Sequence, residues 1–101
     1  MTIYIDIDDT ICTLRVPTDY STATPIPEAI EKVNKLYHEG HYIVFWTARG
    51  TVSGIDWREL TELQLNTWGV PYHELKLGKP AYDLFIDDKN INSKDWLDEK
   101  N

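Results

Sequence analysis

Two aspartates two residues apart, Asp6 and Asp8, follow the apolar residues 3–5 near the start of the chain. In an extended segment such side chains point the same way, so both carboxylates can meet at one point in space. Two neighbouring anions need a cation, and Mg²⁺ accepts carboxylate oxygens while keeping several waters and a substrate phosphate. The spacing therefore favours phosphoryl chemistry, with one carboxylate on the metal and the other moving protons. The alternative for so short a pattern is an acidic strand end that faces water.

Further polar residues adjoin later apolar runs. Thr47 directly follows a run of β-branched and aromatic residues, and the pair Asp87 and Asp88 ends another such run. Lys79 lies in the loop that leads into this second run. A carboxylate that attacks a phosphate dianion meets strong repulsion, so a divalent cation and an ammonium group are needed nearby.

The apolar periodicity predicts the elements that would position these residues. Unbroken β-rich runs indicate buried strands, and apolar residues at helical spacing between Pro and Gly indicate helices. We expect strands at 2–8, 41–46, 70–75 and 82–86, helices at 25–40, 56–69 and 93–99, and loops at 11–24 and 76–80. This alternation predicts a three-layer, Rossmann-like doubly wound parallel sheet of the α/β class. In such sheets functional residues gather at the carboxyl ends of the strands.

The helix expected at 56–69 has two local signals. Asp56 and Glu59 have the spacing of a capping box. Its apolar stripe is expected to contain Trp57, Leu60, Leu63 and Trp68, with Leu65 nearby. We expect the tryptophans to belong to the core rather than to an interface.

The composition limits the classes of function. The chain has 101 residues, expected to form one domain over 1–101, and its net charge of −7 disfavours binding to a nucleic-acid phosphate backbone. The single cysteine, Cys12, excludes an intrachain disulfide and a thiolate zinc cluster, which favours a reducing environment. No apolar run has the length of a membrane span, and no signal-peptide pattern is present. We therefore expect a cytoplasmic protein without nucleic-acid or membrane partners.

The motif at 6–10 (DIDDT), a Thr after a strand, a Lys and a terminal acidic pair resemble, in this chain order, the haloacid dehalogenase-like hydrolase superfamily. The match covers nearly the whole chain. The resemblance implies that Asp6 is the nucleophile that forms an aspartyl-phosphate, and that Asp8 is the general acid and then the general base. It also implies that Thr47 hydrogen-bonds the transferring phosphoryl group and that Lys79 neutralises the charge of nucleophile and phosphate.

The resemblance further implies a magnesium cofactor and a substrate site. The metal ligands are expected from Asp6, Asp8, Asp87 and Asp88. The residues expected around the substrate are Thr47, Ala48, Arg49 and Lys79. Three alternatives stay open: Asp88 binds the metal directly or through water, Lys76 replaces Lys79 as the catalytic lysine, or Arg49 is simply an exposed loop residue.

A departure from larger members of the superfamily concerns the cap domain. The intervals that hold a cap in those proteins contain only a flap at 11–24 and one helix here, which resembles a capless form. Exclusion of water strengthens electrostatic interactions, so the flap, a homo-oligomer or a bulky substrate would have to close the site. Short capless relatives suggest a small phosphorylated substrate, such as a sugar or polyol phosphate of a surface-polysaccharide pathway.

Two other classes of protein remain as alternatives. A receiver-like phospho-acceptor domain also joins an acidic pair, a Thr and a Lys-Pro around Mg²⁺ on a doubly wound sheet. In that family Lys-Pro comes last, whereas here the acidic pair follows Lys79 and Pro80. A catalytically idle metal- or phosphate-binding module would keep the same residues without turnover.

Overall fold

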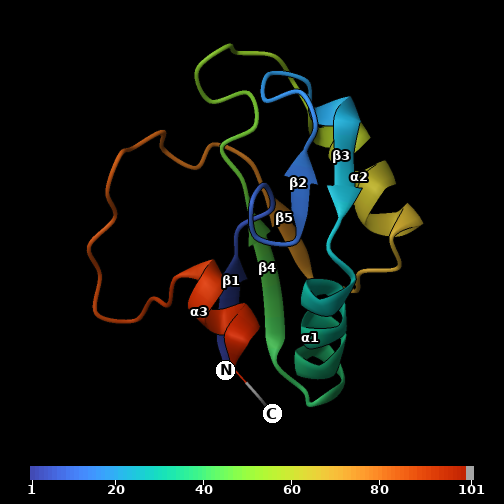
Figure 1. The fold of residues 1–101 in the computed structure, drawn as a ribbon, viewed down its shortest axis with the longest axis vertical. Coiled ribbons are helices and arrows are strands. Elements are labelled where there is room, and N and C mark those ends of the chain that lie inside the picture. The colour runs from blue at the N-terminus through green and yellow to red at the C-terminus, as the bar shows by residue number, and fades with distance from the viewer. Residues whose placement is uncertain (100–101) are drawn as a thin grey trace.

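The computed structural model describes residues 1–99 (Figure 1). Its centre is a sheet of three parallel strands in the order β1–β4–β5. These strands are β1 (Thr2–Ile5), β4 (Tyr42–Trp46) and β5 (Glu74–Lys76). Ile5 of β1 is paired with Phe45, which is paired in turn with Leu75 of β5. A parallel sheet whose strands are linked through helices confirms the predicted Rossmann-like α/β class.

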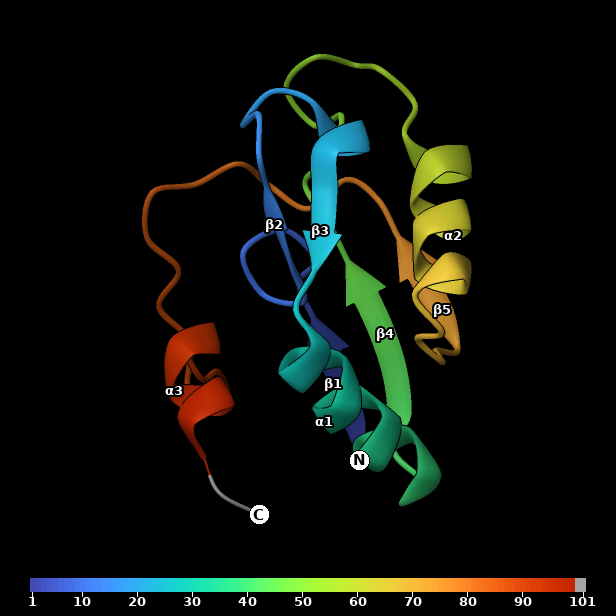
Figure 2. The same ribbon diagram turned by 45° about the vertical axis from the view of Figure 1, so that its right-hand side comes forward.

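Three helices flank this sheet: α1 (Pro27–His38), α2 (Arg58–Thr67) and α3 (Ser93–Asp98). Figure 2 shows α1 against β4 and α2 beside β5. Pro27 occupies the first turn of α1, where its missing N–H is no loss, and Gly40 with φ of 95° reverses the chain after it. Within residues 1–99 no helix combines the length and the apolar composition that crossing a bilayer demands.

The start and the stripe of α2 differ from the prediction. Its N-cap is Trp57 and makes no side-chain capping bond, while the Asp56 carboxylate accepts a hydrogen bond from the Arg58 backbone N–H at 3.0 Å. On the stripe, Leu65 is fully buried, whereas Leu63 is 61% exposed. The contact with the sheet sets the helix rotation, which the local pattern alone left open between these two leucines.

The flap at 11–24 is more ordered than the predicted loop. It contains an antiparallel pair, β2 (Cys12–Leu14) with β3 (Ala23–Pro25), and a short 3-10 helix, η1 (Tyr20–Thr22). Figures 1 and 2 show this hairpin beyond the carboxyl end of β1. The flap therefore stands at the edge of the sheet where functional residues are expected.

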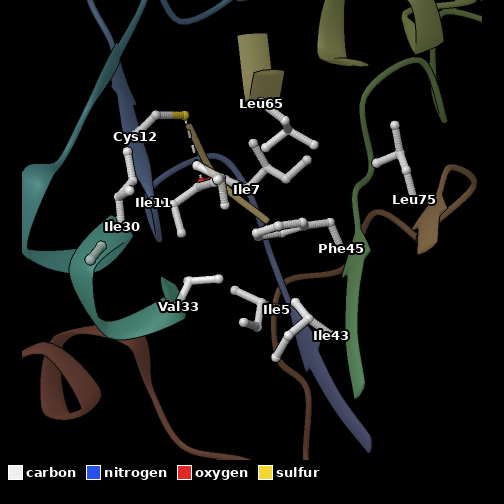
Figure 3. Packing of buried hydrophobic residues seen from close by; sticks show 12 residues of the cluster. Ile5, Ile7, Ile11, Cys12, Ile30, Val33, Ile43, Phe45, Leu65 and Leu75 are labelled. Atoms are coloured by element: carbon white, nitrogen blue, oxygen red, sulfur yellow. Dashed lines mark hydrogen bonds between the residues drawn. The ribbon is translucent and has the colours of Figure 1, made fainter. Parts of the chain in front are cut away.

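The core lies between the sheet and the helices. Phe45 and Ile43 on β4 are fully buried and alternate with residues on the opposite sheet face. Figure 3 shows the Phe45 ring within the cluster, with Leu65 of α2 on one side and Ile5 and Val33 on the other. This cluster fixes β4 and α2 relative to β1, and so fixes the segments that follow them.

The strand expected at 82–86 does not form. Leu84 and Ile86 are 75% and 86% exposed, and Figure 1 shows the segment as an open loop on the side of β1 away from β4. The segment is tethered near the carboxyl end of β1 on both sides: Lys79 pairs with Asp6, and the Ser93 hydroxyl donates to the Asp9 carbonyl at 3.1 Å. A β-rich run becomes a strand only where a partner strand lies alongside it. Here the segment departs from the carboxyl end of β1 and returns to it, and it does not lie alongside β1.

Candidate functional site

Asp6, Ala48 and Lys79 meet at the carboxyl end of the sheet. The Lys79 Nζ lies 3.6 Å from the Asp6 Oδ2, and the Lys79 backbone N–H donates to the Thr47 carbonyl at 3.1 Å. Asp6, Ala48 and Lys79 line a cavity of about 250 Å³ together with residues 80–82. The loops after β1, β4 and β5 therefore deliver a carboxylate and an ammonium group to one hollow, as the topology predicts.

Asp6 has an altered proton affinity. Burial raises the pKa of its carboxyl above the ordinary value of 3.8, while Lys79 and the backbone N–H of Ile7 oppose this rise. The neighbouring Asp8 carboxylate adds to the rise. A carboxylate that has lost part of its hydration and faces an ammonium group is suited to attack an electrophile in the same hollow.

Lys76 ends β5 and Lys79 lies in the loop that follows, and the two side chains meet different partners. Lys79 faces Asp6 and lies over the Tyr82 and Trp46 rings, at 5.5 and 5.9 Å from their centroids. Lys76 instead donates to the Tyr4 hydroxyl at 2.9 Å. The structure thus brings Lys79 rather than Lys76 to the Asp6 carboxylate.

Asp8 is paired with Arg49. Its Oδ2 accepts from Nε of Arg49 at 3.1 Å and its Oδ1 accepts from Nη2 at 2.8 Å, a two-bond fork. Asp9 adopts a positive φ of 62°, so the chain turns immediately after Asp8. The turn begins only after Asp8, and within this arrangement Asp8 pairs with Arg49 whereas Asp6 pairs with Lys79.

Arg49 is only 2% exposed, so its description as an exposed loop arginine is wrong. Its Nη1 donates to Thr61 Oγ1 at 3.1 Å and to Gln64 Oε1 at 2.6 Å, both on α2. The ring of Tyr20 covers the guanidinium, with its centroid 4.8 Å from Cζ. Sequence reasoning missed these three partners. The only local signal was a pair of polar residues three apart on α2, the spacing that places two side chains on one helix face.

The expected phosphoryl-binding residue Thr47 is 1% exposed. Its Oγ1 accepts a hydrogen bond from the Arg49 backbone N–H at 3.2 Å, which closes a tight turn over Ala48. Ala48 follows and lines the cavity with Asp6. Thr47 thus shapes the loop that holds Ala48 against the hollow.

Cys12 packs beside Asp8 and is not a nucleophile. Its Sγ lies 3.4 Å from Asp8 Oδ1 and 3.6 Å from the Ile7 carbonyl, the contact drawn in Figure 3. Burial, reinforced by the Asp8 charge, raises the pKa of the Cys12 thiol to about 12. A thiol that stays protonated at neutral pH is a poor nucleophile, which agrees with a packing role for the buried Cys12.

Asp87 and Asp88 lie apart from the other predicted ligands, on the exposed segment. The Asp87 Oδ1 accepts only from the backbone N–H of Asp88 at 2.8 Å among the bonds found for residues 1–99. Within these residues no group of three or more His, Cys, Asp or Glu side chains could hold a metal ion. Among residues 1–99 the four expected carboxylates therefore do not gather into one metal-binding group: Asp6 and Asp8 pair with Lys79 and Arg49, and the acidic pair lies on the exposed segment.

Comparisons with known proteins support the fold. No family model and no curated protein sequence matches this chain. A crystal structure of a structural-genomics target from Vibrio cholerae does match, with a TM-score of 0.88 and 24% sequence identity. The alignment covers 98% of this chain and 89% of that one. The protein therefore shares the α/β fold of the Vibrio cholerae protein over nearly its whole length.

Proposed function

We propose that this protein is a phosphatase that hydrolyses a small phosphomonoester through an aspartyl-phosphate on Asp6. The observation that supports this most is the Asp6–Lys79 pair, 3.6 Å apart in a cavity at the carboxyl end of the sheet. A cavity of about 250 Å³ suits a substrate such as a sugar or polyol phosphate, because pockets for drug-sized ligands start near 300 Å³.

The charges explain why a lysine must stand beside the nucleophile. Two unit charges of like sign about 4 Å apart repel by about 4 kcal/mol near a protein surface. The Lys79 ammonium offsets the repulsion between the Asp6 carboxylate and an arriving phosphate dianion. The loop turn at Thr47 brings Ala48 to the lining of the same cavity.

The proposed reaction has two displacements at phosphorus. In the first, which starts with Asp8 protonated, an Asp6 Oδ forms a bond to phosphorus while the bond to the leaving oxygen breaks. Asp8 gives its proton to that oxygen and becomes the carboxylate that pairs with Arg49. In the second, Asp8 takes a proton from water, whose oxygen bonds to phosphorus and releases the Asp6 carboxylate. The products are an alcohol and inorganic phosphate.

The proposal includes a magnesium cofactor because the sequence pattern implies one. Because the arrangement of residues 1–99 does not gather its four expected ligands, the steps above use only the chain's own side chains. A magnesium site would require Asp87 and Asp88 to approach Asp6. The test therefore includes measuring turnover with and without MgCl₂.

The test compares the wild type with Asp6→Asn, using Asp98→Asn at an exposed position of α3 as the matched control. Hydrolysis of p-nitrophenyl phosphate should fall by about 10⁴-fold or more in Asp6→Asn and remain unchanged in the control. Acid-quenched wild type, incubated with a ³²P-labelled monoester, should carry label that hydroxylamine releases. If Asp6→Asn hydrolysed the substrate at the wild-type rate, Asp6 would not be the nucleophile.

A second candidate function is an idle phosphate-binding module. The pairing of both Asp6 and Asp8 with cations favours it, since neither carboxylate is left free in this arrangement. It predicts binding of inorganic phosphate, measured by calorimetry, that depends on Lys79 and occurs without any hydrolysis.

A further inference from the structure

The buried guanidinium of Arg49 joins three parts of the molecule. It forms a fork on Asp8 after β1, donates from Nη1 to Thr61 and Gln64 on α2, and lies under the Tyr20 ring of the flap. Gln64 also donates to the Tyr20 carbonyl at 2.8 Å. All three guanidinium nitrogens thus have side-chain acceptors.

This arrangement fixes the Asp8 carboxylate in one plane. A single-point ammonium would let the carboxylate rotate, whereas the planar fork of an arginine binds both oxygens at once. Thr61 and Gln64 in turn prevent the guanidinium from rotating, because Nη1 cannot leave without losing two acceptors. Burying such a charge is unfavourable unless its geometry is fully satisfied.

The exposed fractions of the two side chains show that Arg49 contacts Asp8 from the protein interior. The Arg49 side chain is completely covered, whereas 21% of the Asp8 side chain reaches solvent. The Asp8 carboxylate is therefore anchored by its buried side while it still meets the surface near the flap.

We infer that Arg49 is a positioning residue that aims the Asp8 carboxyl group at the leaving oxygen, with Gln64 and Tyr20 holding the guanidinium and linking the flap to this acid. The inference rests on the proposed function. It concerns how Asp8 acts, whereas the nucleophile test concerns Asp6, so the two can fail separately.

Leaving-group dependence distinguishes this role from simple structural support. A basic leaving oxygen needs a proton as its bond to phosphorus breaks, whereas the weakly basic 2,4-dinitrophenolate does not. Because a positioned general acid contributes about 10²–10⁴-fold, Arg49→Met should lower kcat/KM for phenyl phosphate about 100-fold and for 2,4-dinitrophenyl phosphate less than about fivefold. Arg49→Lys keeps the charge without the fork. Its kcat/KM for phenyl phosphate should therefore lie between those of the wild type and Arg49→Met, whereas its kcat/KM for 2,4-dinitrophenyl phosphate should stay close to the wild-type value.

A double-mutant cycle with Asp8 adds a second test. If Arg49 acts through Asp8, Arg49→Lys should cause no further loss on phenyl phosphate in the Asp8→Asn background. The matched control is Arg58→Met, which removes an arginine of α2 that pairs with Glu62 at 3.7 Å and donates to the Leu75 carbonyl at 3.0 Å. It should leave both substrates unaffected.

Circular dichroism and thermal unfolding show whether each variant is folded. Should Arg49→Met not fold, Gln64→Ala replaces it, because it removes one Nη1 acceptor and should give the same leaving-group pattern at smaller amplitude. Equal losses on both substrates, or additive losses in the cycle, would overturn the inference while leaving Asp6 as nucleophile. Absence of hydrolysis in the wild type would overturn both proposals.

Discussion

Replacing Leu84 and Ile86 together by asparagine should hardly change the free energy of unfolding. This perturbation addresses the largest difference between the sequence pattern and the structure, the exposed segment at 82–86. Full burial of a leucine or isoleucine side chain is worth about 1.5–3 kcal/mol. Since Leu84 is 75% and Ile86 86% exposed, the double variant should lose less than about 1 kcal/mol.

A buried strand would give a very different value. Large-to-small changes in a core cost about 2–5 kcal/mol each, so the same double variant would then lose about 4 kcal/mol or more. The assay is urea unfolding of the wild type and the variant, followed by tryptophan fluorescence. The matched control is Ile43→Ala on the central strand, which is fully buried and should cost about 2–5 kcal/mol.

A loss above about 3 kcal/mol in the double variant without metal would refute the exposed position of this segment. Repeating the titration with MgCl₂ links the result to the proposed site. If Asp87 and Asp88 approach Asp6 to bind the metal, the segment must leave its exposed position. The loss in the double variant should then grow with magnesium, whereas the loss in Ile43→Ala should not.

Two further predictions concern α2 and Asp6. Leu65→Ala should lower the free energy of unfolding by about 2–5 kcal/mol and Leu63→Ala by less than about 0.5 kcal/mol, because only Leu65 is buried; equal losses in urea unfolding would contradict the described rotation of α2. Burial raises the pKa of Asp6, so the folded state binds its proton more tightly than the unfolded chain, and stability falls as pH rises from 3.8 through the raised value. Asp6→Asn removes this loss, so its stability relative to wild type should improve between about pH 3 and about pH 7, and a pH-independent difference would show that the Asp6 pKa is not raised.

The regular elements follow from local patterns. The run 41–46 has no alternation, as a strand buried in a parallel sheet requires, and β4 occupies nearly the same residues. Pro27 and Gly40 mark the ends of α1 for backbone reasons that do not depend on the rest of the chain. The flap, β5 and the run 82–86 were exceptions. Cys12–Leu14 and Ala23–Pro25 pair across a segment with no periodic signal, β5 begins at Glu74 rather than Val70, and the run 82–86 forms no strand.

The candidate site was partly predictable for a similar reason. Parallel strands end at one edge, so the residues after β1 and β4 had to be neighbours, and Asp6 and Ala48 do line one cavity. The resemblance favoured Lys79 over Lys76, and the structure agrees with that preference, because Lys79 pairs with Asp6 whereas Lys76 ends β5 and donates to Tyr4.

The sequence by itself determined the α/β class, the helix that carries Leu65, and the edge at which polar residues gather, because 2.0 and 3.6 residue periods and Pro or Gly signals act within a few residues. Tertiary structure alone decided that Arg49 is buried on Asp8 and that the run 82–86 stays exposed. Both depend on partners distant in the chain: Arg49 meets α2 and the flap, and a strand needs a neighbour whose position no local pattern encodes.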